Sequence, residues 1–99
     1  MIYNKGDNMK IWVVCVSDCE CDYTIAICST KVIAERELFK KRDELIKDYK
    51  EMEKFSADRG LTNNIYTDMI KALSGNDYKK WNNYPHDKPY LYETEILCT

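Results

Sequence analysis

Two apolar runs rich in β-branched residues, with a short polar tip between them, most constrain how this chain folds. The runs occupy residues 10–17 and 23–28, and the tip reads Asp18-Cys19-Glu20-Cys21-Asp22. β-Branched and aromatic residues favour strands, and two such runs around a polar tip favour a hairpin. Residues 32–57 contain no glycine or proline and are dense in helix formers. The sequence therefore predicts a β-hairpin followed directly by a long helix.

Both faces of the predicted hairpin are apolar, because alternate residues of a strand face opposite sides of a sheet. With the tip centred near Glu20, one face holds Ile11, Val13, Cys15, Tyr23, Ile25 and Ile27. The opposite face holds Trp12, Val14, Val16, Thr24, Ala26 and Cys28. One layer of helices covers only one of them. We therefore expect the Trp12/Val14/Val16 face to be covered by Trp81 or by a second copy in a homodimer.

The helical layer is predicted from periodicity and caps. Ser29 and Thr30 are typical N-caps. The long helix then carries an apolar stripe at three-, four- and seven-residue spacings, formed by Val32, Leu38, Phe39, Leu45, Ile46, Tyr49 and Met52. Because Arg42 and Glu53 interrupt this stripe, we favour packing on the sheet over a coiled-coil dimer. After Gly60, Asn63 or Asn64 caps a shorter helix that turns Ile65, Met69, Ile70 and Leu73 inward.

The remaining segments complete an α+β fold. Residues 76–89 are rich in turn formers and aromatics and predict a loop with at most one helical turn, and residues 90–97 predict a strand near an edge. The β-β-α-α-β order favours a three-stranded antiparallel sheet whose first strand is central, with a long and a short helix on one face. We expect residues 1–8 to be a flexible extension of a single domain over residues 9–99.

Four segments carry a resemblance to known proteins: Lys10-Ile11-Trp12-Val13-Val14, Asp22-Tyr23-Thr24-Ile25, Cys28-Ser29-Thr30-Lys31 with Ala34-Glu35, and Tyr90-Leu91-Tyr92-Glu93-Thr94-Glu95-Ile96-Leu97. They resemble the strands, helix start and closing strand of a loosely defined family of small, mostly uncharacterised proteins from low-GC Gram-positive bacteria and their phages. The resemblance covers the hairpin, helix start and last strand, and leaves out the middle of the chain. It implies a phage- or prophage-like protein that grips a host protein, and it implies no functional residue.

Size and charge exclude several classes of function. A chain of 99 residues leaves little room for a large cofactor cavity, so we expect no cofactor. With 15 basic and 17 acidic residues the chain lacks the charge of a nucleic-acid-binding protein. No apolar window reaches the length of a membrane span, so we expect a cytoplasmic protein.

The cysteine-bearing tip is the first candidate site. Five cysteines, an odd number in a chain of this class, are expected to be reduced. Cys19 and Cys21 with their acidic neighbours, joined by Cys15 or His86, form a possible metal site, but zinc knuckles use a wider spacing. The carboxylates beside the two tip cysteines raise a thiol pKa and oppose nucleophilic catalysis. Glu93 and Glu95 lie on one face of an edge strand and are interpreted as solvated charges, not as a catalytic pair. We therefore predict that the protein is not an enzyme and that the cysteine tip binds no metal.

The aromatic loop is the second candidate. Trp81, Tyr84, Tyr78, Lys80 and Tyr90 are predicted as partner-binding residues, because exposed aromatics beside lysines are typical of protein interfaces. In the competing interpretation Trp81 packs in the core with Trp12 and Val14. Stacking of single-stranded nucleic acid is disfavoured by the acidic net charge. The sequence thus predicts a protein-binding module that inhibits a host or defence enzyme by stoichiometric binding, with a ligand- or metal-binding regulator using the cysteine tip as the alternative.

Overall fold

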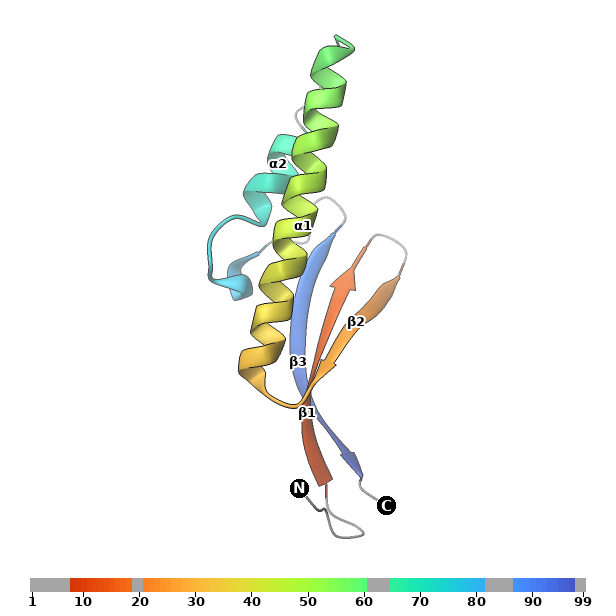
Figure 1. The fold of residues 1–99 in the computed structure, drawn as a ribbon, viewed down its shortest axis with the longest axis vertical. Helices are drawn as coiled ribbons and strands as arrows, with labels where there is room; N and C mark the ends of the chain where they lie inside the picture. Colours follow the sequence, from red (N-terminus) through yellow and green to blue (C-terminus); the bar gives the residue numbers. More distant parts are fainter. Residues whose placement is uncertain (1–7, 19–20, 61–64, 82–86, 98–99) are drawn as a thin grey trace.

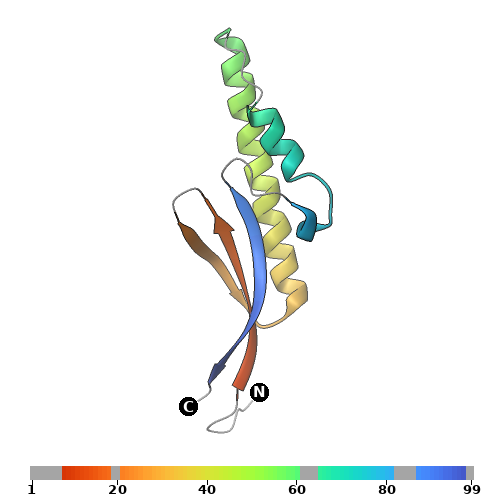
Figure 2. The same cartoon turned by 180° about the vertical axis from the view of Figure 1, so that it is seen from behind.

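The computed structural model describes residues 8–18, 21–60, 65–81 and 87–97, and it confirms the predicted α+β fold. The chain forms strands β1 (Asn8–Ser17) and β2 (Asp22–Cys28), helices α1 (Lys31–Asp58) and α2 (Ile65–Ala72), the 3-10 turn η1 (Tyr78–Lys80) and strand β3 (Lys88–Leu97). The helices and η1 lie on one side of the sheet (Figures 1 and 2). Residues 1–7 of the predicted extension lie outside the described residues, and Asn8 already pairs with Leu97.

The sheet is antiparallel with the order β2-β1-β3, so β1 is central as predicted. β3 pairs with β1 along the whole of both strands, from Asn8 opposite Leu97 to Ser17 opposite Lys88. β2 ends sooner, with Cys28 opposite Trp12. β1 and β3 therefore continue as a two-stranded ribbon beyond the start of α1 (Figure 1).

A β-bulge changes the predicted faces of β2. Val14 pairs with Ala26, whereas the next residue, Cys15, pairs with Thr24, so Ile25 is the extra residue. Ile25 consequently packs against the cluster under α1, and the prediction that it shares a face with Ile11 and Val13 is wrong. The same shift places Thr24 beside Cys15 and Tyr23 opposite Val16. The predicted faces of β2 assumed that its residues alternate strictly between the two sides of the sheet. The sequence itself does not reveal the extra residue that breaks this alternation.

The core lies between α1, α2 and the Trp12/Val14/Val16 face of the sheet. The Thr30 side chain accepts a hydrogen bond from the Ile33 amide and starts α1, as predicted. The predicted packing of α1 on the sheet is confirmed by a cluster made of Val14, Cys28, Ala34, Leu38, Leu45, Tyr49, Met69, Leu73 and Trp81. Two residues of the predicted stripe, Val32 and Met52, are exposed instead. Val14 and Val16 are 0% exposed, so these two side chains are not available to the predicted homodimer interface.

The opposite face of the sheet carries no helix among the described residues. Ile11, Val13 and Cys15 form its centre, shielded in part by Met9 and Tyr90. At its borders Ile27, Tyr92 and Ile96 remain exposed, Ile27 to 67%. Neither α1 nor α2 is long and apolar enough to cross a membrane, and the other described residues form no such helix either.

Candidate functional site

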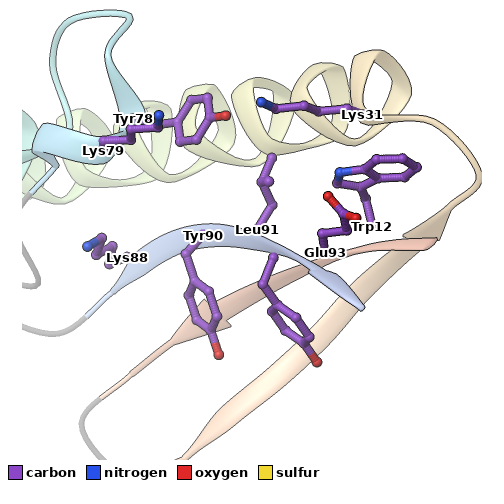
Figure 3. A pocket seen from close by; sticks show the side chains of 9 residues that line it. Trp12, Lys31, Tyr78, Lys79, Lys88, Tyr90, Leu91 and Glu93 are labelled. Carbon is purple, nitrogen blue, oxygen red and sulfur yellow. The ribbon is translucent and has the colours of Figure 1, made fainter. Parts of the chain in front are cut away.

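A cavity of about 330 Å³ lies between the first turn of α1, η1 and strand β3 (Figure 3). It combines three lysines with aromatic and aliphatic surface, and its lining residues are Trp12, Lys31, Tyr78, Lys79, Lys88, Tyr90, Leu91, Tyr92 and Glu93. We call it the basic cavity. Because four separate elements contribute to it, the basic cavity exists only in the folded chain.

Other hollows lie along the outside of α1. Each of the two larger ones is lined by α1 alone, with acidic and basic side chains in similar numbers, such as Asp43, Lys47 and Glu51. Mixed charges on one face of a surface helix are typical of solvated side chains. The basic cavity is therefore the stronger candidate for a site.

Two caps place Lys31, Lys79 and Tyr78 of the basic cavity, whereas Lys88 begins β3. Thr30 caps α1, so Lys31 is the first helical residue. Asp77 caps η1 by accepting a hydrogen bond of 3.3 Å from the Lys79 amide. In Figure 3 the Lys31 side chain extends toward Tyr78 above Leu91. Both caps belong to short polar segments, and they fix the backbone positions of Lys31 and Lys79.

The electrostatics of the basic cavity are positive. Lys31, Lys79 and Lys88 form no ion pair with any residue that the structure describes. Glu93, by contrast, pairs with Lys10, with an Nζ–Oε1 distance of 3.6 Å. The pKa of the Tyr78 hydroxyl is raised, first by burial and then by the nearby Glu35 carboxylate. Three lysines and one glutamate line the cavity, and that glutamate is paired with Lys10, which leaves an excess of positive charge.

Trp81 lies in the core and is only 2% exposed. Its indole Nε1 donates a hydrogen bond of 3.1 Å to the Gly75 carbonyl, and its ring meets Phe39 edge to face at 5.7 Å. It shares the buried cluster with Val14, and Trp12 packs against the same cluster. Of the two interpretations of Trp81, the structure therefore shows the packed one.

The other predicted partner-binding residues are separated. Tyr78 and Tyr90 border the basic cavity, whereas Lys80 is exposed, lies outside its lining and pairs with Asp77. Tyr90 points away from α1 (Figure 3) and donates a hydrogen bond of 2.8 Å to the Asp22 carboxylate. That hydrogen bond, with some burial, raises the pKa of the Tyr90 hydroxyl. Tyr84 lies outside the described residues.

Arg42 interrupts the apolar stripe in the sequence. In the structure it is buried and links α1 to the residues that follow α2. Its guanidinium donates to the carbonyls of Leu73 at 3.1 Å and Gly75 at 2.6 Å, and it lies over the rings of Phe39 and Trp81. The Leu73 carbonyl, directly after the last residue of α2, has no helical partner and is satisfied in this way. Arg42 thereby ties the segment that leads into η1 to α1. A charged residue within an apolar stripe is the only sequence signal for this role.

The cysteine tip shows hairpin geometry in its described part. The Asp18 side chain accepts a hydrogen bond of 2.8 Å from the Cys21 amide, and the Asp18 amide donates to the Cys21 carbonyl. Cys19 and Glu20 lie outside the described residues. Within the described ranges no three His, Cys, Asp or Glu side chains gather as metal ligands. Cys15, Cys21 and Cys28 form no disulfide among the described residues.

The sequence prediction found part of the basic cavity and missed the rest. Tyr78 and Tyr90 were expected to bind a partner, but Lys31, Lys88 and Trp12 come from segments interpreted as a helix start, a loop end and a strand. Only the fold brings them together. Comparison of the chain with protein-family models, with curated proteins and with solved structures finds no match.

Proposed function

We propose that this protein is a binding module that captures another protein stoichiometrically through the basic cavity. Lys31, Lys79 and Lys88 supply the cationic contacts, and Trp12 and Tyr78 supply aromatic surface. The observation that carries the proposal is the set of three lysines without an ion pair among the described residues around an apolar floor.

Charge complementarity supports a protein partner with acidic groups. Lysines held near one another repel, and carboxylates of a partner remove that repulsion and speed the encounter. Lysine alone is a poor interface residue, whereas aromatic side chains are common anchors. The combination of Trp12 and Tyr78 with the lysines therefore favours a specific interface over general attraction of anions.

The resemblance to phage proteins suggests which class of protein the partner belongs to. Small proteins of that kind grip host proteins, and one group disarms defence systems. A stoichiometric inhibitor of a host or defence enzyme would use the basic cavity to reach an acidic patch on its target. This narrower role is a prediction that rests on the resemblance of the hairpin and of the last strand.

The test compares two triple variants with equal change in charge. One replaces the cavity lysines (Lys31→Glu/Lys79→Glu/Lys88→Glu), and the matched control replaces exposed lysines on α1 (Lys40→Glu/Lys47→Glu/Lys50→Glu). A protein captured from host lysate is purified, and its affinity and stoichiometry are measured by calorimetry. We expect 1:1 binding that the cavity variant weakens at least about tenfold and the control retains. Equal affinity for both variants would contradict the proposal.

A further inference from the structure

The outer edge of β3 is open from Leu91 to Glu93, beside the basic cavity, whereas Pro89 just before them is fully buried. β3 is an edge strand, and among the described residues no strand pairs with its outer side. None of the turn and loop hydrogen bonds between described residues reaches the backbone of residues 88–93. The same residues contribute much of the cavity lining. An edge strand with unpaired backbone groups is a template for a further strand.

The backbone of β3 forms one wall of the basic cavity. Tyr90 lines the cavity, yet its side chain points away from α1 and bonds to Asp22 (Figure 3). Tyr92 stacks on Tyr90, with ring centroids 6.4 Å apart, and so lies on the same face. Both tyrosines therefore border the cavity with their main chain, while Leu91 reaches into it from the opposite face (Figure 3).

Pro89 indicates which backbone groups face outward. Proline has no N–H, and within sheets it occupies positions on edge strands where that missing donor faces away from the neighbouring strand. Because backbone groups alternate in direction along a strand, Leu91 and Glu93 then also point their N–H and C=O groups outward. Tyr90 and Tyr92 bond inward, opposite Cys15 and Val13 of β1. Leu91 and Glu93 thus offer free donors and acceptors at the wall of the cavity.

We propose, building on the binding function above, that an extended acidic segment of the partner protein adds to β3 as a fourth strand. Residues of that segment opposite Leu91 and Glu93 project toward α1, where Lys31 and Lys79 receive their carboxylates. The residues between them lie beside Tyr90 and Tyr92 on the uncovered face. The segment therefore alternates acidic residues with β-branched or aromatic residues.

The edge of β2 lacks the features that favour β3. The small hollow beside β2 is lined by Ile25 with two lysines and two glutamates of α1, so its charges balance. Charge complementarity therefore selects the β3 edge.

The experiment uses a synthetic peptide, acetyl-(Glu-Val)4-amide, with the full-length 15N-labelled protein. Amide hydrogen exchange and the fluorescence of the half-buried Trp12 follow binding. We expect exchange at Leu91 and Glu93 to slow at least about tenfold, while Tyr90 and Tyr92 change little because they already bond to β1. The matched acetyl-(Lys-Val)4-amide, and a Glu-Val peptide N-methylated at alternate residues, are expected to bind at least about tenfold more weakly.

Three results would overturn the inference. Equal binding of the N-methylated peptide without protection of Leu91 and Glu93 would exclude strand addition while leaving the basic cavity as the docking site. No binding of the Glu-Val peptide to a folded protein that still captures its partner through the cavity lysines would exclude an extended acidic occupant. Binding of the Glu-Val peptide that Lys31→Glu/Lys79→Glu leaves unchanged would place it elsewhere. Failure of the proposed function itself is seen separately, in the calorimetry of the triple variants.

Discussion

Nη1 of Arg42 donates a hydrogen bond of 2.6 Å to the carbonyl of Gly75, which joins the middle of α1 to the turn after α2. The same guanidinium also reaches the Leu73 carbonyl at 3.1 Å, and Arg42 is 9% exposed. A buried cation with two carbonyl acceptors and two aromatic neighbours holds its surroundings in one arrangement. The position of η1, and with it Tyr78 and Lys79, depends on this contact.

Replacement of Arg42 is therefore expected to destabilise the protein strongly. Arg42→Ala leaves the Leu73 carbonyl without its donor and the Gly75 carbonyl with only the Trp81 indole, at a cost of about 3 kcal/mol in the free energy of unfolding. Urea unfolding followed by circular dichroism measures this loss. The exposed Arg36 on the same helix is the control, and Arg36→Ala is expected to change the free energy of unfolding by less than about 0.5 kcal/mol. Similar effects of the two substitutions would show that the buried contacts contribute little.

Trp81→Ala is expected to lower stability rather than to remove a binding contact. The buried indole loses its packing against Phe39 and its hydrogen bond to Gly75, which together stabilise the fold by about 3–5 kcal/mol. The neighbouring Lys80→Ala, at an exposed position, serves as the control. Thermal unfolding distinguishes the two outcomes. An unchanged Tm for Trp81→Ala with loss of the partner would assign Trp81 to the interface instead.

Stability is expected to fall at alkaline pH through Tyr49. Burial and the hydrogen bond to Asp87, which is 2.6 Å long, raise the pKa of the Tyr49 hydroxyl above its ordinary value. The folded state therefore holds this proton more tightly than the unfolded state, whose tyrosines titrate near pH 10. The contribution is fully present below about pH 10 and is lost as the pH rises toward the folded-state pKa. Urea unfolding at pH 8–11 should show a smaller decline for Tyr49→Phe than for the wild type. An equal decline would assign the effect to other groups.

Cysteine labelling should separate the exposed thiol from the buried ones. Cys21 is exposed, whereas Cys15 and Cys28 are buried in the sheet. With iodoacetamide under native conditions we expect Cys21 to react, and Cys15 and Cys28 to react only after urea is added. Peptide mapping by mass spectrometry identifies the modified residues. Rapid native labelling of Cys28 would mean that α1 separates readily from the sheet.

The hairpin, both helices and the closing strand could be predicted because each depends on local patterns. Alternation and β-branched residues mark β1, and the Thr30 cap with its uninterrupted helix formers marks α1. The bulge at Ile25 could not be predicted, because an inserted residue changes the pairing without changing the composition. As a result, the faces were assigned correctly on β1 but not on part of β2.

The basic cavity could be predicted only in part. Tyr78 and Tyr90 stand in an aromatic segment that attracts notice, whereas Lys31 and Lys88 look like ordinary surface lysines in the sequence. Their meeting depends on the return of β3 alongside β1 and on Arg42 holding the end of α2. From the sequence, Arg42 is only a charged residue that interrupts an apolar stripe. Its burial could not be predicted, because its carbonyl acceptors lie 31 and 33 positions away in the sequence.

The pairing of β3 with β1 also sets the stage of folding at which the basic cavity forms. β2 meets β1 through a short tip, whereas β3 returns across a long stretch of chain, as the contact between Asp22 and Tyr90 over 68 positions illustrates. Such distant pairings form slowly, since a large loop must close first. A molecule that has formed only its hairpin and α1 lacks β3, which lines the basic cavity opposite Lys31. The basic cavity is therefore complete only once β3 has paired with β1.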